Sequence, residues 1–353
     1  MKLKTDIIFI AIITLIAIAL GVGTLANKGQ KISFEENRTL ASSPTVSLHS
    51  VLDGSFFSEL SAFCSDRIPL REQMIRAKAV CELAMGKQEN NGVAFISERL
   101  VDRCVYDSLN TLEENLTAIK KLTQNSSAIA VIVPRSADVY RNSEEALAVR
   151  SFCDDGQLYQ KLSNTNNAYY KTDHHLDAEG SFVTYEYVME MLGYTPLPRS
   201  EFQLTAVSES FRGTVYSRAG LLPVYCDTVS AWRYEGDDEL TVTCYDTGCC
   251  VDSLYKEAAL EEKDKYRYFL GGNHGHLTIK SEKEERPKLY LIKDSFANSV
   301  IPLLARHFDL TVYDTRYSAT PPPCPEGAKT VVLCGLDTLA TTKSFTIPLR
   351  LVK

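Results

Sequence analysis

The sequence lacks any cluster of lysine and arginine residues, and its formal net charge is -7. Nucleic-acid binding normally needs a stripe of positive charge that neutralises phosphates, so the composition argues against a nucleic-acid partner. An acidic tail, an internal repeat and a low-complexity tract are also lacking. With 44% hydrophobic and 24% charged residues, the 353-residue chain has the composition of a globular protein with room for one large domain or two ordinary ones.

The ten cysteines include no CxxC pair and show no regular spacing. Ten cysteines in an exported protein would suggest disulfides, but this spacing does not define any pairing. Cys244, Cys249 and Cys250 lie close together in the sequence, yet a zinc pattern would need a matching second pair. We therefore expect no cofactor and leave the disulfide pattern open.

A long hydrophobic run lies near the N-terminus, where Ile7 to Ala26 carry no charge. As a helix, such a run can cross a hydrocarbon core of roughly 30 Å. Lys2 and Lys4 precede it, as is typical of signal sequences and signal anchors. We expect residues 1–27 to form a signal anchor, with the C-terminal domain outside the cytoplasm of a single-pass cell-membrane protein. Cleavage after Ala26 is the alternative.

The remainder divides by pattern into two regions. Residues 28–95 are predicted to form a helical stalk or arm, because Phe56, Leu60 and Phe63 recur at helical spacing. Residues 96–353 are predicted to form an α/β domain, in which residues 200–270 are a β-rich excursion interrupted by glycines. Asp177 to Leu192 has the pattern of a helix that is capped by Asp177 and stopped by Gly193.

Short apolar runs indicate a mainly parallel sheet. Such runs, without polar alternation, are typical of parallel strands that are buried on both faces. In the last third they alternate with a predicted helix over Ile301–Phe308, which favours right-handed crossovers. The predicted strands are Ala128–Val133, Lys288–Ile292, Leu310–Tyr313 and Thr330–Leu333.

Ser295 follows one of these strands at the start of a predicted helix. Open α/β sheets bind their ligands at this edge, where free backbone N–H groups and the helix dipole can stabilise an oxyanion. A serine there is a candidate nucleophile for acyl transfer. The alternative is that Asp294 or Ser295 serves only as a helix cap.

A serine nucleophile needs a histidine base that a carboxylate orients. Asp173, His174 and His175 lie in the loop before the helix that starts near Asp177, and the chain has only six histidines. We therefore predict that His175 is the base and that Asp173 orients it. Metal binding is the competing interpretation, with His274 and His276 as further ligands, but neither histidine pair matches a motif such as HExxH.

The segments Lys171–His175 and Lys293–Asn298 together resemble the DHHW protein family, a bacterial family similar to the SGNH-hydrolase-like alginate O-acetyltransferases. Further matching segments are Glu36–Leu40, Asp66–Arg71, Phe269–His274 and Asp314–Tyr317. The resemblance implies an SGNH-hydrolase-like α/β three-layer sandwich with a mainly parallel sheet. It also carries the catalytic roles to Asp173, His175 and Ser295. Leu176 stands where the family has the tryptophan of its name.

The expected activity is acetyl transfer to a cell-envelope polysaccharide, or hydrolysis of its esters, with a membrane acyl-donor protein as a further partner. Ser295 would carry the acyl group, and His174 would support His175. Asn273 is the side-chain candidate for an oxyanion donor, while Arg316 and Tyr317 are candidates for substrate contact. The alternative is a non-catalytic envelope protein of the same fold that binds glycan or a protein partner.

Overall fold

The computed structural model describes residues 2–33, 35–36, 38–102, 109–141, 157–222, 225–248, 251–343 and 345–346. Within it the chain divides into two compact units. Unit 1 comprises Met1–Asn91 and Ser217–Val224, and unit 2 comprises Gly92–Tyr216 and Tyr225–Lys353. Cys249 and Cys250, which entered the zinc alternative, lie outside the described residues.

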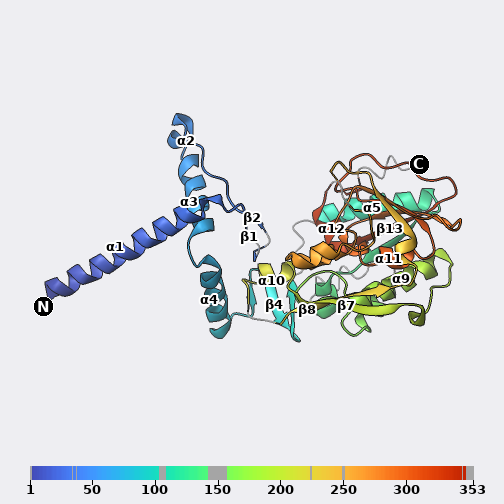
Figure 1. The fold of residues 1–353 in the computed structure, drawn as a ribbon, viewed down its shortest axis with the longest axis horizontal. Helices are drawn as coiled ribbons and strands as arrows, with labels where there is room; N and C mark the ends of the chain where they lie inside the picture. The colour runs from blue at the N-terminus through green and yellow to red at the C-terminus, as the bar shows by residue number, and fades with distance from the viewer. Residues whose placement is uncertain are drawn as a thin grey trace. The chain divides into compact units, whose positions relative to one another are not determined.

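Unit 1 begins with the apolar helix predicted from the sequence, α1 (Lys2–Ala26), which Figure 1 shows as one long helix. The stretch Asp6–Gly29 has a mean hydropathy of 2.7 over its most apolar window and is long enough to cross a membrane. Its large apolar side chains, such as Ile10 and Leu15, are exposed. These properties fit a signal anchor or a signal sequence.

The rest of unit 1 is held together by ion pairs between its hairpin and its helices. The carboxylate of Glu36 accepts hydrogen bonds from Arg38 and Arg71, and Arg38 also binds Asp66 at 2.5 Å. The hydrogen bond from Arg38 lowers the pKa of Asp66 to about 2. The elements are β1 (Ile32–Ser33), β2 (Arg38–Thr39), α2 (Leu48–Leu52), α3 (Ser55–Arg67), α4 (Arg71–Ala84) and β3 (Glu89–Asn90).

Unit 2 is built on a six-stranded sheet with the order β6-β13-β11-β12-β10-β9. The pairs β6–β13, β13–β11 and β11–β12 are parallel, whereas β10 pairs antiparallel with both β12 and β9. The mainly parallel sheet that the apolar runs predict is therefore confirmed. Its strands are β6 (Ile129–Val133), β9 (Leu240–Cys244), β10 (His276–Ser281), β11 (Lys288–Lys293), β12 (Asp309–Tyr313) and β13 (Lys329–Gly335).

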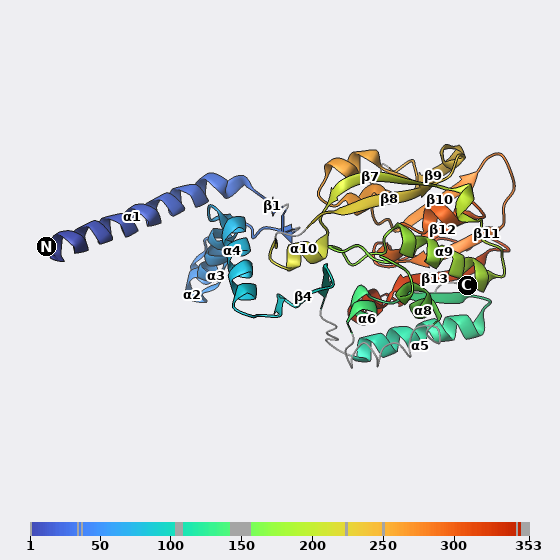
Figure 2. The same cartoon turned by 90° about the horizontal axis from the view of Figure 1, so that it is seen from below.

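Helices cover both faces of this sheet, which gives three layers (Figure 2). Leu289 and Leu291 of β11 belong to one core cluster with residues of α9 (Ala178–Leu192) and α11 (Ile301–Leu304). Tyr290 and Ile292 of the same strand point the other way and pack with α5 (Leu109–Asn125) and α12 (Leu336–Thr341). Both faces of the strand are buried, which is why its sequence is a continuous apolar run.

The remaining elements of unit 2 surround the sheet. The hairpin β4 (Val93–Ile96) and β5 (Arg99–Asp102) is antiparallel, as is the ribbon of β7 (Gln203–Phe211) and β8 (Asp227–Arg233). Part of the predicted β-rich excursion thus forms a separate ribbon, whereas β9 belongs to the main sheet. Short helices are α6 (Ser136–Tyr140), α8 (Gln157–Ser163) and α10 (Thr214–Arg218), with 3-10 turns at Arg199–Glu201, Asp237–Glu239, Glu257–Glu261 and Lys265–Tyr268.

Candidate active site

Ser295 begins a 3-10 turn, η7 (Ser295–Ala297), directly after β11. The preceding Asp294 is the cap of this turn: its carboxylate accepts hydrogen bonds from Phe296 N at 2.9 Å and from Gly335 N at 2.7 Å. Burial raises the pKa of Asp294. Because Asp294 takes the capping role, the half-buried Ser295 hydroxyl has no hydrogen-bond partner among the described residues.

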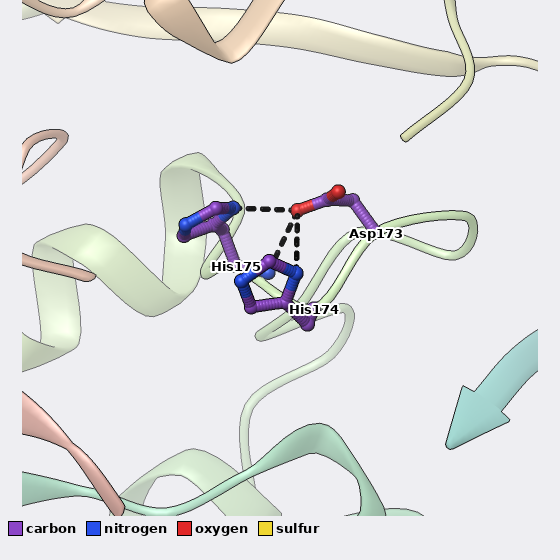
Figure 3. Close-up of side chains that lie close together, drawn as sticks. All are labelled: Asp173, His174 and His175. Carbon is purple, nitrogen blue, oxygen red and sulfur yellow. Dashed lines mark hydrogen bonds and ion pairs between the residues drawn. The ribbon is translucent and has the colours of Figure 1, made fainter. Parts of the chain in front are cut away.

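The carboxylate of Asp173 organises the histidine loop (Figure 3). One oxygen, Oδ1, accepts hydrogen bonds from His175 Nδ1 at 2.6 Å and from the His175 backbone N–H at 3.0 Å. The other, Oδ2, accepts from the backbone and the hydroxyl of Thr214. Burial would raise the pKa of Asp173, but the two histidines and these hydrogen bonds outweigh it and lower the pKa. Asp173 is therefore an anion.

The loop that carries Asp173 is fixed on both sides. The carboxylate of Asp227 accepts hydrogen bonds from the backbone of Lys171 and Thr172 at 2.8 and 2.7 Å. At Gly213 an added Cβ would lie 2.2 Å from the Asp173 side chain, so only glycine permits this close approach. Asp177 caps α9 as predicted, since it accepts a hydrogen bond from Gly180 N. These contacts hold the Asp173 carboxylate in one position.

His175 lies beside the Ser295 turn through an aromatic contact. Its ring stacks on Tyr266, with centroids 3.9 Å apart and an interplanar angle of 12°. The Tyr266 hydroxyl in turn donates to the backbone carbonyl of Ser295 at 2.9 Å, and the Phe296 ring centroid is 5.4 Å from that of His175. The structure thus brings the histidine loop and the serine turn, far apart in the sequence, into one neighbourhood.

The two ring nitrogens of His175 have different surroundings. The Asp173 carboxylate accepts only, so Nδ1 carries the proton, whereas Nε2 is buried without a hydrogen-bond partner among the described residues. Burial and, to a lesser extent, the neighbouring His174 together lower the pKa of His175 to about 4. At neutral pH the ring is therefore neutral, with a free lone pair on Nε2. No hydrogen bond joins this nitrogen to Ser295 Oγ.

His174 packs against both His175 and Phe296 of the serine turn. Its ring centroid lies 3.9 Å from that of His175 and 5.7 Å from that of Phe296. Its Nδ1 is 2.8 Å from the hydroxyl of Thr214 and 3.6 Å from Asp173 Oδ1. His174 is thus placed to fix the ring of His175 from the side.

The remaining candidate residues gather at the ends of β11 and β12. Asn273 contacts Lys293 and Asn298, which flank Ser295 in the sequence. Arg316 is held by the carboxylate of Asp314 at 2.8 and 3.0 Å, and its charge contributes to the lowered pKa of His175. Tyr317, which is 57% exposed, lies next to these residues, with its hydroxyl 3.5 Å from Asn273 Nδ2.

Sequence reasoning missed Tyr266, Lys293 and Asp314. Lys293 and Asp314 stand at the carboxyl ends of β11 and β12, where parallel sheets collect functional side chains, and this position was the available signal. Tyr266 lies in a turn-rich segment and has no comparable signal. Its role depends on its contacts with the histidine ring and the serine turn, which are distant in sequence.

The competing metal interpretation can be tested by geometry. The ligand atoms of Asp173, His174 and His175 lie within 4.8 Å of one another. However, Asp173 Oδ1 and His175 Nδ1 are only 2.6 Å apart and bond to each other, which leaves no space for an ion that needs about 2.0–2.2 Å to each ligand. In the second cluster, Cys244 with Asp246 and His274, the cysteine is disulfide-bonded. Neither cluster offers a set of free ligands.

A mainly parallel sheet with helices on both faces and a serine at its carboxyl edge defines a three-layer α/β protein. Within this class, the profile of the family described as "DHHW protein" matches residues 101–314, which is more than half of the chain. The chain therefore belongs to the DHHW family. No curated protein sequence matches it.

Solved structures share the fold at low sequence identity. A DHHW family protein from Eubacterium siraeum is 18% identical, with a TM-score of 0.58 over 75% of this chain and 97% of that one. PatB1 of Bacillus cereus, solved with a sulfonyl adduct, is also 18% identical, with a TM-score of 0.57 over 71% and 96%. The O-acetyltransferase domain of Pseudomonas putida AlgJ is 12% identical, covers 71% and 93%, and has a TM-score of 0.40, too low to support a common fold.

Proposed function

We propose that the protein is a serine-dependent enzyme that transfers an acetyl group to, or hydrolyses an acetyl ester of, a cell-envelope carbohydrate. Ser295 is the nucleophile, His175 the general base and Asp173 the group that orients the base. A signal anchor formed by α1 would hold the enzyme on the outer side of the cell membrane, where such a glycan is accessible. A membrane protein that supplies the acyl group is the partner that transfer would require.

The observation that carries this proposal is the state of His175. Its Nδ1–H is bound by a buried carboxylate, and its Nε2 has no hydrogen-bond partner in the part of the chain that the structure describes. Its ring lies against Tyr266, which binds the Ser295 carbonyl. A serine hydroxyl is a weak nucleophile until a neutral base accepts its proton. A neutral imidazole with a free lone pair is such a base, and the tautomer set by Asp173 presents the correct nitrogen.

In the proposed reaction the Ser295 oxygen attacks the ester carbonyl while its proton passes to His175 Nε2. The imidazolium then returns the proton to the leaving alcohol, and an acetyl group remains on Ser295. Attack by a sugar hydroxyl gives transfer, and attack by water gives hydrolysis. No hydrogen bond joins Ser295 Oγ to His175 Nε2 in the structure, and catalytic contacts of this kind often tighten only when substrate binds.

The loss of the family tryptophan at position 176 is compatible with activity. Leu176 is 0% exposed and pairs with Tyr169 in an isolated β-bridge, so position 176 is part of the core. Exchange of one apolar core residue for another alters packing beneath the loop, but it removes no group from the surface that a substrate could contact. The contacts of Asp173 and His175 described above do not involve the Leu176 side chain.

Covalent labelling tests the proposal. The full chain in detergent is treated with phenylmethanesulfonyl fluoride, and intact mass and peptide mapping locate the adduct. We expect one adduct on the wild type and on the matched control Ser210→Ala, whose serine is exposed on β7, and none on Ser295→Ala. Likewise, the wild type and Ser210→Ala should release acetate from p-nitrophenyl acetate and from O-acetylated polysaccharide, and Ser295→Ala should not.

The alternative is a binding protein that retains the fold without catalysis, and the absence of a hydrogen bond between Ser295 and His175 favours it. The labelling experiment separates the two. A wild type that forms no adduct and releases no acetate, while it binds glycan, would support the binding function. Equal labelling of the wild type and Ser295→Ala would place the reactive group elsewhere and contradict the proposed nucleophile.

A further inference from the structure

A chain of polar contacts starts from Lys293, the last residue of β11. This side chain is 0% exposed, although lysine is rarely buried without a defined role. Its Nζ lies 2.8 Å from Asn298 Oδ1, 3.4 Å from Asn273 Oδ1 and 3.4 Å from Asp314 Oδ2. All three neighbours are oxygens, so Lys293 acts as a hydrogen-bond donor toward each of them.

The donor at Lys293 determines how the Asn298 carboxamide is turned. An amide has one oxygen acceptor and one nitrogen donor, and only the oxygen can face an ammonium group. Asn298 Oδ1 therefore faces Lys293, and Asn298 Nδ2 faces the opposite way. From there it donates to the backbone carbonyl of Gly272 at 3.3 Å and to Asn273 Oδ1 at 3.1 Å.

The same logic then fixes Asn273. Its Oδ1 accepts from Asn298 Nδ2 and lies within reach of Lys293, so its own Nδ2 must point away from both donors. Among the residues that the structure describes, Nδ2 donates to the hydroxyl of the exposed Tyr317, at a long 3.5 Å. A stronger acceptor can therefore replace Tyr317 at this nitrogen at little cost.

We propose that Lys293 is a positioning residue, which acts through Asn298 to hold the Asn273 carboxamide with its N–H group directed at the developing oxyanion of an ester on Ser295. This inference rests on the proposed function. An oxyanion donor contributes most when it is already oriented before the reaction, because no reorganisation is then needed in the transition state. The fixed element is the dipole of Asn273, and Lys293 itself does not touch the substrate.

A purely structural role for Lys293 is the competing explanation. Lys293 and Arg316 both approach the buried Asp314, and the loss of one cation from such a group can destabilise the fold. The two explanations differ in one respect. If Lys293 acts through Asn273, removing Lys293 lowers the activity no further once Asn273 is absent. If Lys293 is only structural, the loss of activity on its removal adds to the loss caused by the Asn273 substitution.

The test is a double-mutant cycle with p-nitrophenyl acetate hydrolysis by the full chain. We expect Asn273→Ala to lower kcat by roughly 10²–10³-fold. Lys293→Met should lower kcat by roughly tenfold to a hundredfold with little change in KM, as expected when an interaction is lost only in the transition state. The double variant should match Asn273→Ala within about twofold. Lys288→Met, at the exposed start of the same strand, is the matched control and should leave kcat unchanged.

Asn298→Asp provides a second test if Lys293→Met does not fold. The carboxylate keeps an oxygen for Lys293 but has no N–H for Asn273 or Gly272, so kcat should fall as in Lys293→Met. Multiplicative losses in the double variant, or full activity of both Asn298→Asp and Lys293→Met, would overturn the inference.

A structural readout separates this inference from the proposed function. In crystal structures of Lys293→Met and Asn298→Asp, the Asn273 carboxamide should rotate or adopt two conformations. If the wild type neither reacts with the sulfonyl fluoride nor releases acetate, the proposed function fails, and this readout alone decides whether Lys293 orients Asn273. An Asn273 side chain that keeps its orientation in both variants would contradict the inference.

Discussion

Two buried aspartates, Asp173 and Asp314, each bind a protonatable side chain, but they leave that partner in different states. Asp173 is 2% exposed and holds His175, whose second ring nitrogen has no hydrogen-bond partner within the described ranges of the chain. Asp314 is 0% exposed and faces Lys293, whose ammonium group is surrounded by carboxylate and amide oxygens. In the Asp173–His175 pair the histidine keeps a lone pair that is not used in a hydrogen bond. In the Asp314–Lys293 pair the N–H groups of the lysine are engaged with oxygens.

This difference separates proton transfer from positioning. A base can accept a proton only through a free lone pair, and neutral His175 has one on Nε2, for which the described residues offer no hydrogen-bond partner. Burial lowers the pKa of Lys293, but oxygens of Asp314, Asn298 and Asn273 lie around its Nζ, so Lys293 acts as a donor and offers no lone pair to accept a proton. We therefore expect variants at Asp173 to affect mainly the rate of reaction at Ser295, and variants at Asp314 to affect mainly the stability of the fold.

The largest expected effect is that of Asp173→Asn. An asparagine fits the same space but presents an N–H or a weaker acceptor to His175 Nδ1, so the tautomer with a free Nε2 loses its support. In serine proteases the equivalent change costs about 10⁴-fold in rate, and we expect a loss of that order in the sulfonylation rate of Ser295. Asp337→Asn, an exposed change in α12, is the control. A loss below tenfold would contradict the assigned role of Asp173.

The next effect in size is that of Asp314→Asn on stability. The change leaves Lys293 and Arg316 as buried or half-buried cations without their carboxylate, which typically costs about 3–5 kcal/mol. We expect the midpoint of urea unfolding to fall accordingly. Asp309→Asn, at the start of β12, keeps an oxygen that accepts from Ser281 N, so it should lower the free energy of unfolding far less. Equal stabilities of the two variants would show that the Asp314 cluster contributes little to the folded state.

The sequence predicted the parallel part of the sheet but not its antiparallel edge. The strands β11, β12 and β13 are buried on both faces, and such burial leaves continuous apolar runs that can be recognised locally. The edge strand β9 pairs with β10, more than thirty residues further along the chain. Its sequence alternates between apolar and polar residues in a segment rich in turns. No local signal indicates which distant strand such a segment joins.

The candidate site shows the same limit. Residue types, spacing and family resemblance point to Asp173, His175 and Ser295, because an acid, an imidazole and a hydroxyl together make up the set that serine catalysis needs. Tyr266 and Lys293 were not selected. A tyrosine in a turn-rich segment and a lysine at the end of a strand are ordinary in sequence and usually exposed. Only their tertiary contacts, with the His175 ring and the Asn298 amide, give them a role.

The pH dependence of labelling gives the smallest of the expected effects and sharpens the comparison further. Burial lowers the pKa of His175 to about 4, below the ordinary value of 6.5. A histidine with the ordinary pKa is only about 3% neutral at pH 5, whereas one with a pKa of about 4 is about 90% neutral. The sulfonylation rate of the wild type at pH 5 should therefore stay near its value at pH 7, instead of falling roughly 25-fold.

Stability should depend on pH through the same group. Because the folded state has the lower pKa, the unfolded chain binds more protons between pH 6.5 and 4, so the stability contributed by neutral His175 is complete above pH 6.5 and is lost as pH falls toward 4. The pKa of His307 is also lowered to about 4, which adds a similar dependence of stability on pH. The His175→Gln variant isolates the contribution of His175.

Asp177, with a pKa raised by burial to about 7, titrates in the same pH range. Asp177→Asn keeps the helix cap while it removes that titration. If the sulfonylation rate of Asp177→Asn falls as pH drops through 6.5, His175 is solvated and charged in this range, and it no longer differs from Lys293 in having a free lone pair.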